Sequence, residues 1–141
     1  MSKKPLFTTP QEAETAFYEA LERGDLDAMM QVWSEDDEVV CVHPGGPRLA
    51  GYALVREGWR HIFDGGTRLK VQLLSLSTVH GPFSAVHSII EKIGVVGENI
   101  LSAPVVATNV YVRGPLGWRM IVHHASPVPP DSIGEIPQIL H

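Results

Sequence analysis

The spacing of hydrophobic residues changes from mainly helical to alternating at Gly65 and Gly66, and this change constrains the fold more than any other feature. Before the two glycines, apolar residues recur with helical spacing. After them, Arg68–Leu73 alternates between polar and apolar residues, as a half-buried strand does. Three further strand-like runs follow between glycine or proline turns, over 83–95, 100–113 and 118–126. Helices followed by strands joined through tight turns indicate an α+β fold containing an antiparallel meander.

Three helices are expected before the meander. The first has complete start and stop signals, a capping box with proline in the first turn and a terminal glycine. These signals are Thr9, Pro10, Glu12 and Gly24. Asp25 is placed to cap a short second helix, and a third helix is predicted from about Tyr52 to Asp64.

The stretch Val39–His43 is predicted to be a short buried strand. Pro44 ends it, because proline has no N–H to donate and restricts the residue before it. The segment from Gly45 to Gly51 is predicted to be a loop. His43 therefore lies at a strand end beside a turn. It is either a general base, since imidazole titrates near neutrality, or a histidine that only caps the strand.

Together these elements predict three N-terminal helices packed in the concave face of a strongly curved, mostly antiparallel sheet. Leu74 and Leu76 fall out of phase with the preceding alternation, which predicts a bulge near Leu73 and Leu74. Bulges bend and twist sheets, and a curled sheet covered by helices encloses a pocket. The 141 residues suffice for a single domain, with 1–8 as a loose lead-in and 127–141 as an irregular tail.

The composition argues against several classes of partner. A net charge of −5 without a basic run disfavours nucleic acid and anionic membrane surfaces. The N-terminal residues lack the apolar run of a secretory signal and no apolar stretch reaches membrane length, so we expect neither feature. The single cysteine, Cys41, fits a reducing cytoplasm. The histidines lack metal-site spacing and no phosphate-binding glycine motif occurs, so neither a metal nor a cofactor is expected.

Several short segments form a set that resembles a known superfamily. They are Phe17–Leu21, Gly24–Ala28, Trp33, His43 with Pro44, Gly51, Trp59, Gly117–Arg119 and His123–Ser126. The set spans roughly residues 9–127 and resembles the nuclear transport factor 2-like superfamily. This superfamily includes ketosteroid isomerases, SnoaL-like polyketide cyclases and the association domain of calmodulin-dependent kinase. The resemblance implies a cone of curved sheet and three helices, and it leaves the activity open because this fold hosts isomerases, dehydratases, cyclases and binding modules.

The resemblance to ketosteroid isomerases implies three functional positions, and all three differ here. These enzymes carry a carboxylate base at the end of the first strand, where Cys41–Pro44 has none. Their oxyanion-binding tyrosine corresponds to Phe17, with Tyr18 as its neighbour, and their protonated acid falls near Thr108. We therefore expect no ketosteroid isomerase of the usual mechanism, which a ketosteroid isomerisation assay would check.

His43 and His123 are the candidate catalytic residues, as acid–base imidazoles. The candidate ligand-binding residues are Phe17, Tyr18, Trp59, His87 and Thr108. For His87 and Trp59, packing in the core is the alternative interpretation. Neighbours on a strand point to opposite faces, so only one of His123 and His124 faces the pocket. The resemblance to the kinase association domain implies His123 inward with Trp118 and His124 outward, and a bulge would reverse this.

Two functions fit these features. The first is a small-molecule-binding pocket protein that acts by acid–base chemistry on an apolar or cyclic metabolite. The alternative is a non-catalytic ligand-binding or dimeric assembly domain, favoured because the expected catalytic places hold no carboxylate. Under either function we expect a homodimer through the outer face of the sheet, where Trp118, Met120 and Val122 are predicted to lie.

Overall fold

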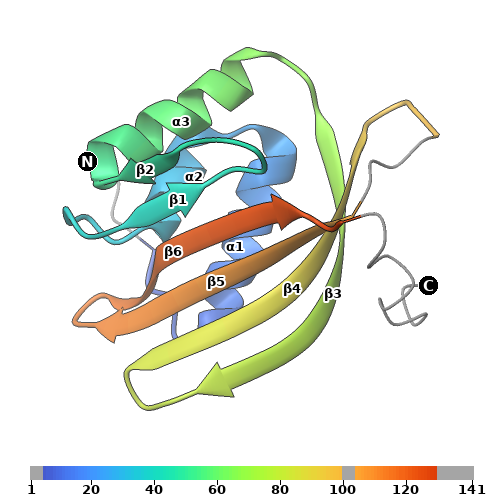
Figure 1. Ribbon diagram of the computed structural model, residues 1–141. Helices are drawn as coiled ribbons and strands as arrows, with labels where there is room; N and C mark the ends of the chain where they lie inside the picture. The colour runs from blue at the N-terminus through green and yellow to red at the C-terminus, as the bar shows by residue number, and fades with distance from the viewer. Residues whose placement is uncertain (1–4, 100–103, 130–141) are drawn as a thin grey trace.

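Residues 5–99 and 104–129 are described by the computed structural model, and within them the chain forms three helices and six strands (Figure 1). In chain order these are α1 (Pro10–Arg23), α2 (Leu26–Val32), β1 (Val40–Val42), β2 (Arg48–Ala50), α3 (Tyr52–Asp64), β3 (Leu69–His80), β4 (Ser84–Val95), β5 (Val105–Gly114) and β6 (Gly117–Pro127). The predicted α+β order is confirmed. Residues 100–103 of the predicted third long strand and 130–141 of the predicted tail lie outside the described residues.

Local sequence explains both ends of α1. Thr9 is extended and its side chain accepts a hydrogen bond from the Glu12 N–H at 3.1 Å, while Pro10 occupies the first turn. Gly24 ends the helix in the left-handed region with φ 64°. The Glu12 carboxylate accepts from the backbone N–H and the hydroxyl of Thr8, at 2.7 and 3.0 Å. These contacts lower the pKa of Glu12, and a hydrogen bond from the backbone N–H of Thr9, the contact of the predicted capping box, adds to this effect.

The described strands form one sheet in the order β2-β1-β6-β5-β4-β3. The strands β3 to β6 make the predicted antiparallel meander, and β1 joins it by pairing parallel with β6. The prediction of a loop over Gly45–Gly51 is wrong in part, because Arg48–Ala50 pairs antiparallel with β1 as β2. Three residues are too few to show alternation in the sequence, so this strand is defined by its partner.

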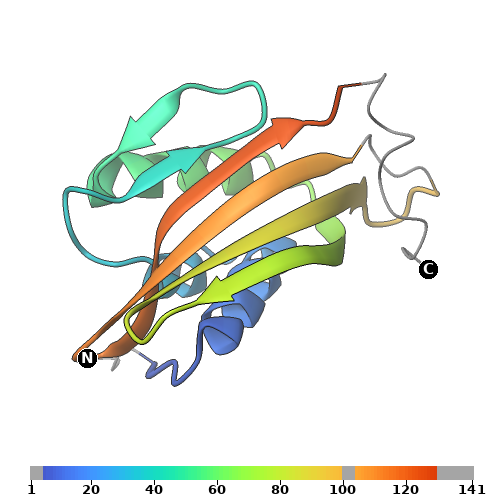
Figure 2. The ribbon, with the colours of Figure 1, turned by 60° about the horizontal axis from the view of Figure 1, so that its bottom comes forward.

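The sheet is strongly curved, and α1, α2 and α3 all lie on its concave side (Figure 2). A bulge in β3 contributes to the bend, because the register with β4 shifts between Ser75 and Ser77. The bulge lies further along the strand than predicted, since Leu73 and Leu74 both keep regular partners in β4. The predicted architecture of three helices in a curved sheet is confirmed.

A second bulge, in β6, corrects the predicted facing of that strand. The register between β5 and β6 shifts so that Tyr111 pairs with Met120, and Ile121 becomes an extra residue. The alternation of inward and outward side chains therefore reverses at Ile121. Trp118 and Met120 pack in the core, 7% and 0% exposed, instead of on the outer face.

The N-terminal lead-in is partly ordered by the start of β6. Phe7 forms a parallel bridge with Gly117, and its carbonyl oxygen accepts from the Trp118 N–H at 2.9 Å. The Arg119 guanidinium lies over the Phe7 ring, 5.0 Å from its centroid, and donates to the carbonyl oxygen of Pro5. The prediction of a loose lead-in therefore does not hold for the residues from Pro5 onward.

The core lies between the helices and the concave face of the sheet. Its largest fully buried side chains include Trp33, Trp59, Tyr111, Phe17 and Met29. Trp33 packs in this core, as predicted. No helix of the described residues is long and apolar enough to cross a membrane.

Candidate functional site

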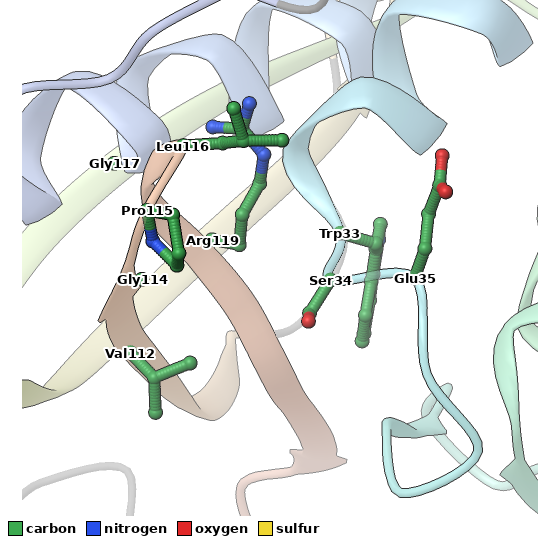
Figure 3. A pocket seen from close by; sticks show the side chains of 9 residues that line it. All are labelled: Trp33, Ser34, Glu35, Val112, Gly114, Pro115, Leu116, Gly117 and Arg119. Carbon is green, nitrogen blue, oxygen red and sulfur yellow. The ribbon is translucent and has the colours of Figure 1, made fainter.

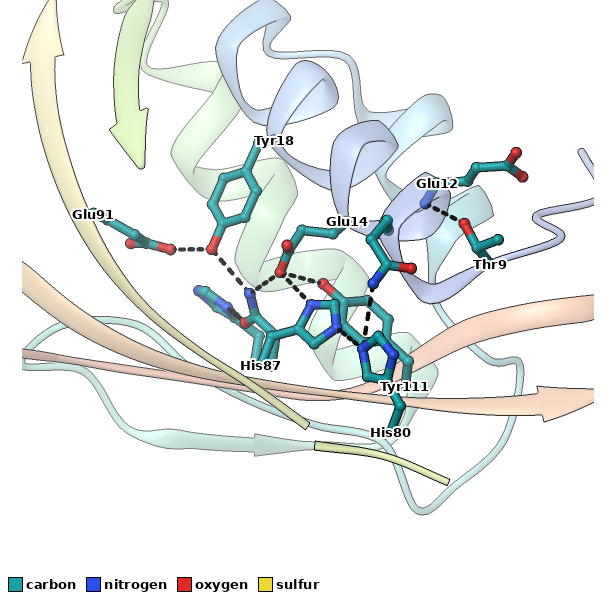
Figure 4. A network of polar contacts seen from close by, with 11 residues as sticks. Thr9, Glu12, Glu14, Tyr18, His80, His87, Glu91 and Tyr111 are labelled. Carbon is teal, nitrogen blue, oxygen red and sulfur yellow. Dashed lines mark hydrogen bonds and ion pairs between the residues drawn. The ribbon is translucent and has the colours of Figure 1, made fainter. Parts of the chain in front are cut away.

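Polar side chains from α1 and four strands gather on the concave side of the sheet (Figure 4). Glu14 and Tyr18 share one face of α1 because they are four residues apart. On the strands, alternate residues point inward. These inward polar residues are His80 of β3, His87 and Glu91 of β4, Asn109 and Tyr111 of β5, and His123 of β6. We call the whole set, with Glu14 and Tyr18, the interior network.

One half of the interior network is a chain of four side chains. The Tyr18 hydroxyl donates to Glu91 Oε2 at 2.6 Å and accepts from Asn109 Nδ2 at 2.9 Å. The Asn109 Oδ1 accepts from His123 Nδ1 at 2.6 Å. Because a carbonyl oxygen only accepts, neutral His123 carries its proton on Nδ1 and keeps a lone pair on Nε2. None of the four residues is more than 5% exposed.

The other half centres on the Glu14 carboxylate. Its Oε1 accepts from His87 Nδ1 at 3.0 Å, from the Tyr111 hydroxyl at 3.1 Å and from Asn109 Nδ2 at 3.5 Å. The Nε2 atoms of His87 and His80 are 2.9 Å apart. His87 is 1% exposed, whereas His80 lies at the surface. The network therefore runs from solvent into the core.

An aromatic subsite adjoins His123. We define it as Phe17, Trp59, His43 and His123, whose rings contact each other: the centroids are 4.8 Å apart for Phe17 and His123, 5.5 Å for Phe17 and Trp59, and 4.5 Å for His43 and Trp59. The buried indole N–H of Trp59 has no acceptor among the described residues. An unpaired buried N–H costs about 1–3 kcal/mol. A ligand oxygen or a water molecule accepting this hydrogen would remove that cost.

Burial sets the protonation of the acids in the network. It raises the pKa of Glu91 from 4.5 to about 7; the hydrogen bond from Tyr18 opposes this shift and the charge of Glu14 adds to it. Burial and the neighbouring carboxylates raise the pKa values of Tyr18 and Tyr111 well above the ordinary value. The two phenols therefore stay protonated, while Glu91 gains and loses a proton near neutral pH.

Burial also keeps the imidazoles of the aromatic subsite neutral. It lowers the pKa of His123 from 6.5 to about 3, with smaller contributions from His43 and His124. Burial alone lowers the pKa of His43 to about 4. Both rings are therefore weak bases that offer hydrogen-bonding atoms. Burial raises the pKa of the Cys41 thiol to about 12, which makes this cysteine a poor nucleophile.

Most residues named as site candidates from the sequence come together. The aromatic subsite and the interior network hold His43, His123, Phe17, Tyr18, Trp59 and His87. His123 is 3% exposed and faces inward, whereas His124 is exposed, as predicted. Thr108 is exposed on the outer face, so its predicted inward position is wrong by one residue. Asn109 faces inward instead, because side chains alternate along a strand.

The structure adds polar residues that the sequence reasoning missed, which are Glu14, His80, Glu91, Asn109 and Tyr111. Carboxyl groups thus enter the interior from α1 and β4, not from the end of β1. A signal for Glu91 exists in the sequence, since it interrupts an apolar strand in phase with His87 and such a charge needs a partner. A signal for Glu14 is its four-residue spacing from Tyr18.

A separate groove lies beside the β5–β6 hairpin (Figure 3). It has a volume of about 320 Å³ and is lined by Trp33, Ser34, Glu35, Val112, Gly114, Pro115, Leu116, Gly117 and Arg119. The Arg119 guanidinium already donates to the carbonyl oxygens of Trp118 and Pro5. No lining residue belongs to the interior network. Within the described ranges, no three histidine, cysteine or carboxylate side chains gather as metal ligands.

The fold and the sequence match one protein family. The model of the SnoaL-like domain family matches residues 11–131. The chain belongs to the SnoaL-like family. Among solved structures, this SnoaL-like chain is 40% identical to a Thiobacillus denitrificans protein assigned as a calcium/calmodulin-dependent protein kinase type II association domain. The TM-score is 0.84, and the match covers 89% of this chain and 99% of the other.

Two further relatives differ widely in their assignments. A Streptomyces avermitilis protein of the NTF2-like family, assigned as a dehydratase, is 37% identical with a TM-score of 0.73, covering 83% of the SnoaL-like chain and 91% of its own. The Arabidopsis thaliana F-box protein SKIP8 is 27% identical over 115 residues, which are 79% of this chain and 46% of that protein, so the chain spans less than half of this relative. Structures with a cystatin-like fold at 16% and 18% identity show the fold alone. The superfamily predicted from the sequence is confirmed.

Proposed function

We propose that the interior of this SnoaL-like domain binds a small apolar or cyclic molecule and moves a proton to or from it, with Glu91 as the acid–base group. One observation carries the proposal: Glu91 is 2% exposed, has a pKa of about 7 and lies 2.6 Å from the Tyr18 hydroxyl. A general acid or base is most effective when its pKa lies near the working pH. Acid–base groups with raised pKa values are also concentrated at functional sites.

The aromatic subsite supports the binding half of the proposal. Phe17 and Trp59 supply apolar aromatic rings that pack edge to face, and the Trp59 N–H is a donor without an acceptor among the described residues. His43 and His123, predicted as catalytic residues, are proposed here to orient the ligand, since their low pKa values make them weak bases. Asn109 joins His123 to Tyr18, so hydrogen bonds through Asn109 and Tyr18 link this subsite to Glu91.

We expect the protein to accelerate the exchange of protons next to the carbonyl group of cyclic ketones. Nuclear magnetic resonance in heavy water measures this exchange for cyclohexanone, cyclohexenone and tetralone. The Glu91→Gln variant should lose about a hundredfold or more of the acceleration, because glutamine keeps the shape but cannot exchange a proton. Glu98→Gln, at an exposed position after β4, is the matched control and should keep it.

Two outcomes would contradict the proposal. Exchange no faster than in buffer for all three ketones would remove the catalytic half. An unchanged resonance of the Trp59 indole N–H at saturating ketone would remove the binding half. The indole signal is informative because this N–H has no acceptor among the described residues and would shift on donating to a ligand oxygen.

A second proposal is assembly as a homodimer through the outer face of the sheet. It is supported by the relative assigned as an association domain and by apolar side chains on the face opposite the helices. Val79 and Val86 pair across β3 and β4 and are 67% and 38% exposed. Val110 and Val122 pair across β5 and β6 and are half-buried. Apolar side chains that lie together on one exposed face are typical of protein–protein interaction sites.

Light scattering coupled to sizing chromatography is expected to give twice the mass of one chain. A Val110→Asp substitution should reduce it to a single chain, because it places a charge in the centre of the apolar face. Leu54→Asp, at a 55% exposed position on α3, is the control and should leave the mass unchanged. A single-chain mass for the wild type at every concentration would rule out the dimer.

The proposed partners are therefore a small molecule and a second copy of the chain, acting in the cytoplasm. The net charge of −5 supports the absence of nucleic acid and anionic membranes from this set. The reducing location is supported by the single cysteine of the chain, Cys41, which is fully buried.

A further inference from the structure

The imidazole rings of His80 and His87 meet head-on. Their Nε2 atoms are 2.9 Å apart and their ring centroids are 5.1 Å apart. The distance between the centroids exceeds the distance between the Nε2 atoms by about one ring width. The two Nε2 atoms therefore point at each other along the line that joins the rings. This is the geometry of one proton shared between two nitrogens. A metal ion held by both would need lone pairs that converge on a third point, as tetrahedral zinc ligands do.

His87 is oriented by Glu14 so that its other nitrogen stays free for this shared proton. The His87 Nδ1 donates to Glu14 Oε1 at 3.0 Å. A carboxylate only accepts, so Nδ1 carries a hydrogen and Nε2 faces His80. His87 is 1% exposed, whereas His80 reaches solvent. The side-chain amide nitrogen of Gln11 lies 3.3 Å from the same His80 Nε2, and a half-turn of this amide presents its oxygen instead when His80 carries a proton on Nε2. A proton from water can therefore reach His87 Nε2 either through His80 or during a local opening of the protein.

We propose that His80, His87 and Glu14 form a proton relay between solvent and the interior network. His80 takes a proton from water on Nδ1 and gives its Nε2 proton to His87 Nε2. His87 then gives its Nδ1 proton to Glu14 Oε1. One proton enters and one arrives, only N–H and O–H bonds change, and the reverse steps export a proton. The inference rests on the proposed function, since a relay serves a site that consumes or releases protons.

The titratable groups around His87 come from each element packed against it. Glu14 faces it from α1, His80 from β3 and Tyr111 from β5, with Glu91 further along β4. Tyr111 donates to Glu14 and its pKa is raised well above the ordinary value, so it keeps its own proton. A proton arriving on Glu14 removes a negative charge that helps to keep Glu91 protonated, which favours proton release from Glu91. The relay is thus coupled to the acid–base group by charge.

The test measures how fast the buried ring N–H protons of His87 exchange with water, by nuclear magnetic resonance of protein with isotope-labelled histidine. His80→Phe keeps an aromatic ring at this exposed position but removes both nitrogens. His80→Gln keeps hydrogen-bonding groups but cannot pass a proton through a ring. Exchange should slow about tenfold or more in both variants, because it must then wait for local opening. His61→Phe, at an exposed position on α3, is the matched control and should exchange as the wild type does.

A competing route exists, because the Glu14 side chain is 19% exposed and water can reach its carboxylate directly. Exchange that slows in neither or only one of the His80 variants would overturn the relay and assign exchange to the Glu14 route or to opening. Ring exchange does not depend on turnover. If exchange slows in both His80 variants but the wild type is inactive in the ketone assay, the relay stands and the proposed function is rejected. If the wild type is active but exchange does not slow in both variants, the proposed function stands and the relay is rejected.

Discussion

The Glu91→Gln variant is expected to be more stable than the wild type by about 3 kcal/mol at about pH 9, and equally stable at about pH 4. The pKa of Glu91 is about 7 in the folded protein, because burial penalises its charge, and 4.5 is its ordinary value. Between these values the native state holds a proton that the unfolded chain has released. The free energy of unfolding therefore falls as the pH rises through this window, and the full cost is present above it. Glutamine stays neutral and its Oε1 accepts from Tyr18 as the carboxyl oxygen does.

Denaturant unfolding of both proteins across this pH range measures the difference. The matched control is Glu98→Gln, which changes the same chemical group at an exposed position and should follow the wild-type curve. The decisive quantity is the change in the stability difference with pH, since any loss of packing appears at every pH. A constant difference between wild type and Glu91→Gln would show that Glu91 does not titrate near neutrality inside the protein.

When the pH falls from about 7 to about 4, the free energy of unfolding of the His123→Asn variant is expected to fall by about 3 kcal/mol less than that of the wild type. Burial lowers the pKa of His123 from 6.5 to about 3, so the unfolded chain binds a proton in this window that the native state does not. The contribution of His123 to stability is therefore fully present above pH 6.5, its ordinary pKa, and is lost as the pH falls toward about 3, its pKa in the folded protein. Asparagine does not titrate, and its side-chain N–H can replace Nδ1 as the donor to Asn109.

His124→Asn is the matched control, because His124 is the adjacent histidine and is exposed. Its stability should follow the wild-type curve on acidification. The His123→Asn curve should keep part of the acid loss, since burial also lowers the pKa of His43 to about 4. Parallel curves for wild type and His123→Asn over the whole range would contradict a buried, neutral His123.

Only part of the candidate site can be predicted from the sequence. The inward-facing His123, Tyr18 and His87 are recognisable from the sequence, because a polar residue in an apolar strand or on a helix face is visible locally. Glu91 carries the same kind of signal, whereas the resemblance to ketosteroid isomerases implies a carboxylate base at the end of β1. The structure places no carboxylate there and supplies one from β4, where the Tyr18 hydroxyl can reach it.

The sequence by itself determined the helices and the order of the long strands. The cap at Thr9, the glycine at Gly24 and the helical spacing over Tyr52–Asp64 act within a few residues of each other, so they are effective before any tertiary contact forms. The turn between β3 and β4 and the turn between β5 and β6 are likewise local. For the same reason, the α+β class and the curved-sheet architecture were predictable.

Only the tertiary structure decided which side chains meet inside the cone. The bulge at Ile121 exists because β6 pairs with β5 out of step, and it alone turns Trp118 and Met120 into the core while His123 also faces inward. The inward position of Asn109 instead of Thr108 depends on the same pairing. The raised pKa of Glu91 and the lowered pKa of His123 arise from burial, which is a property of everything packed around a group and not of its neighbours in the chain.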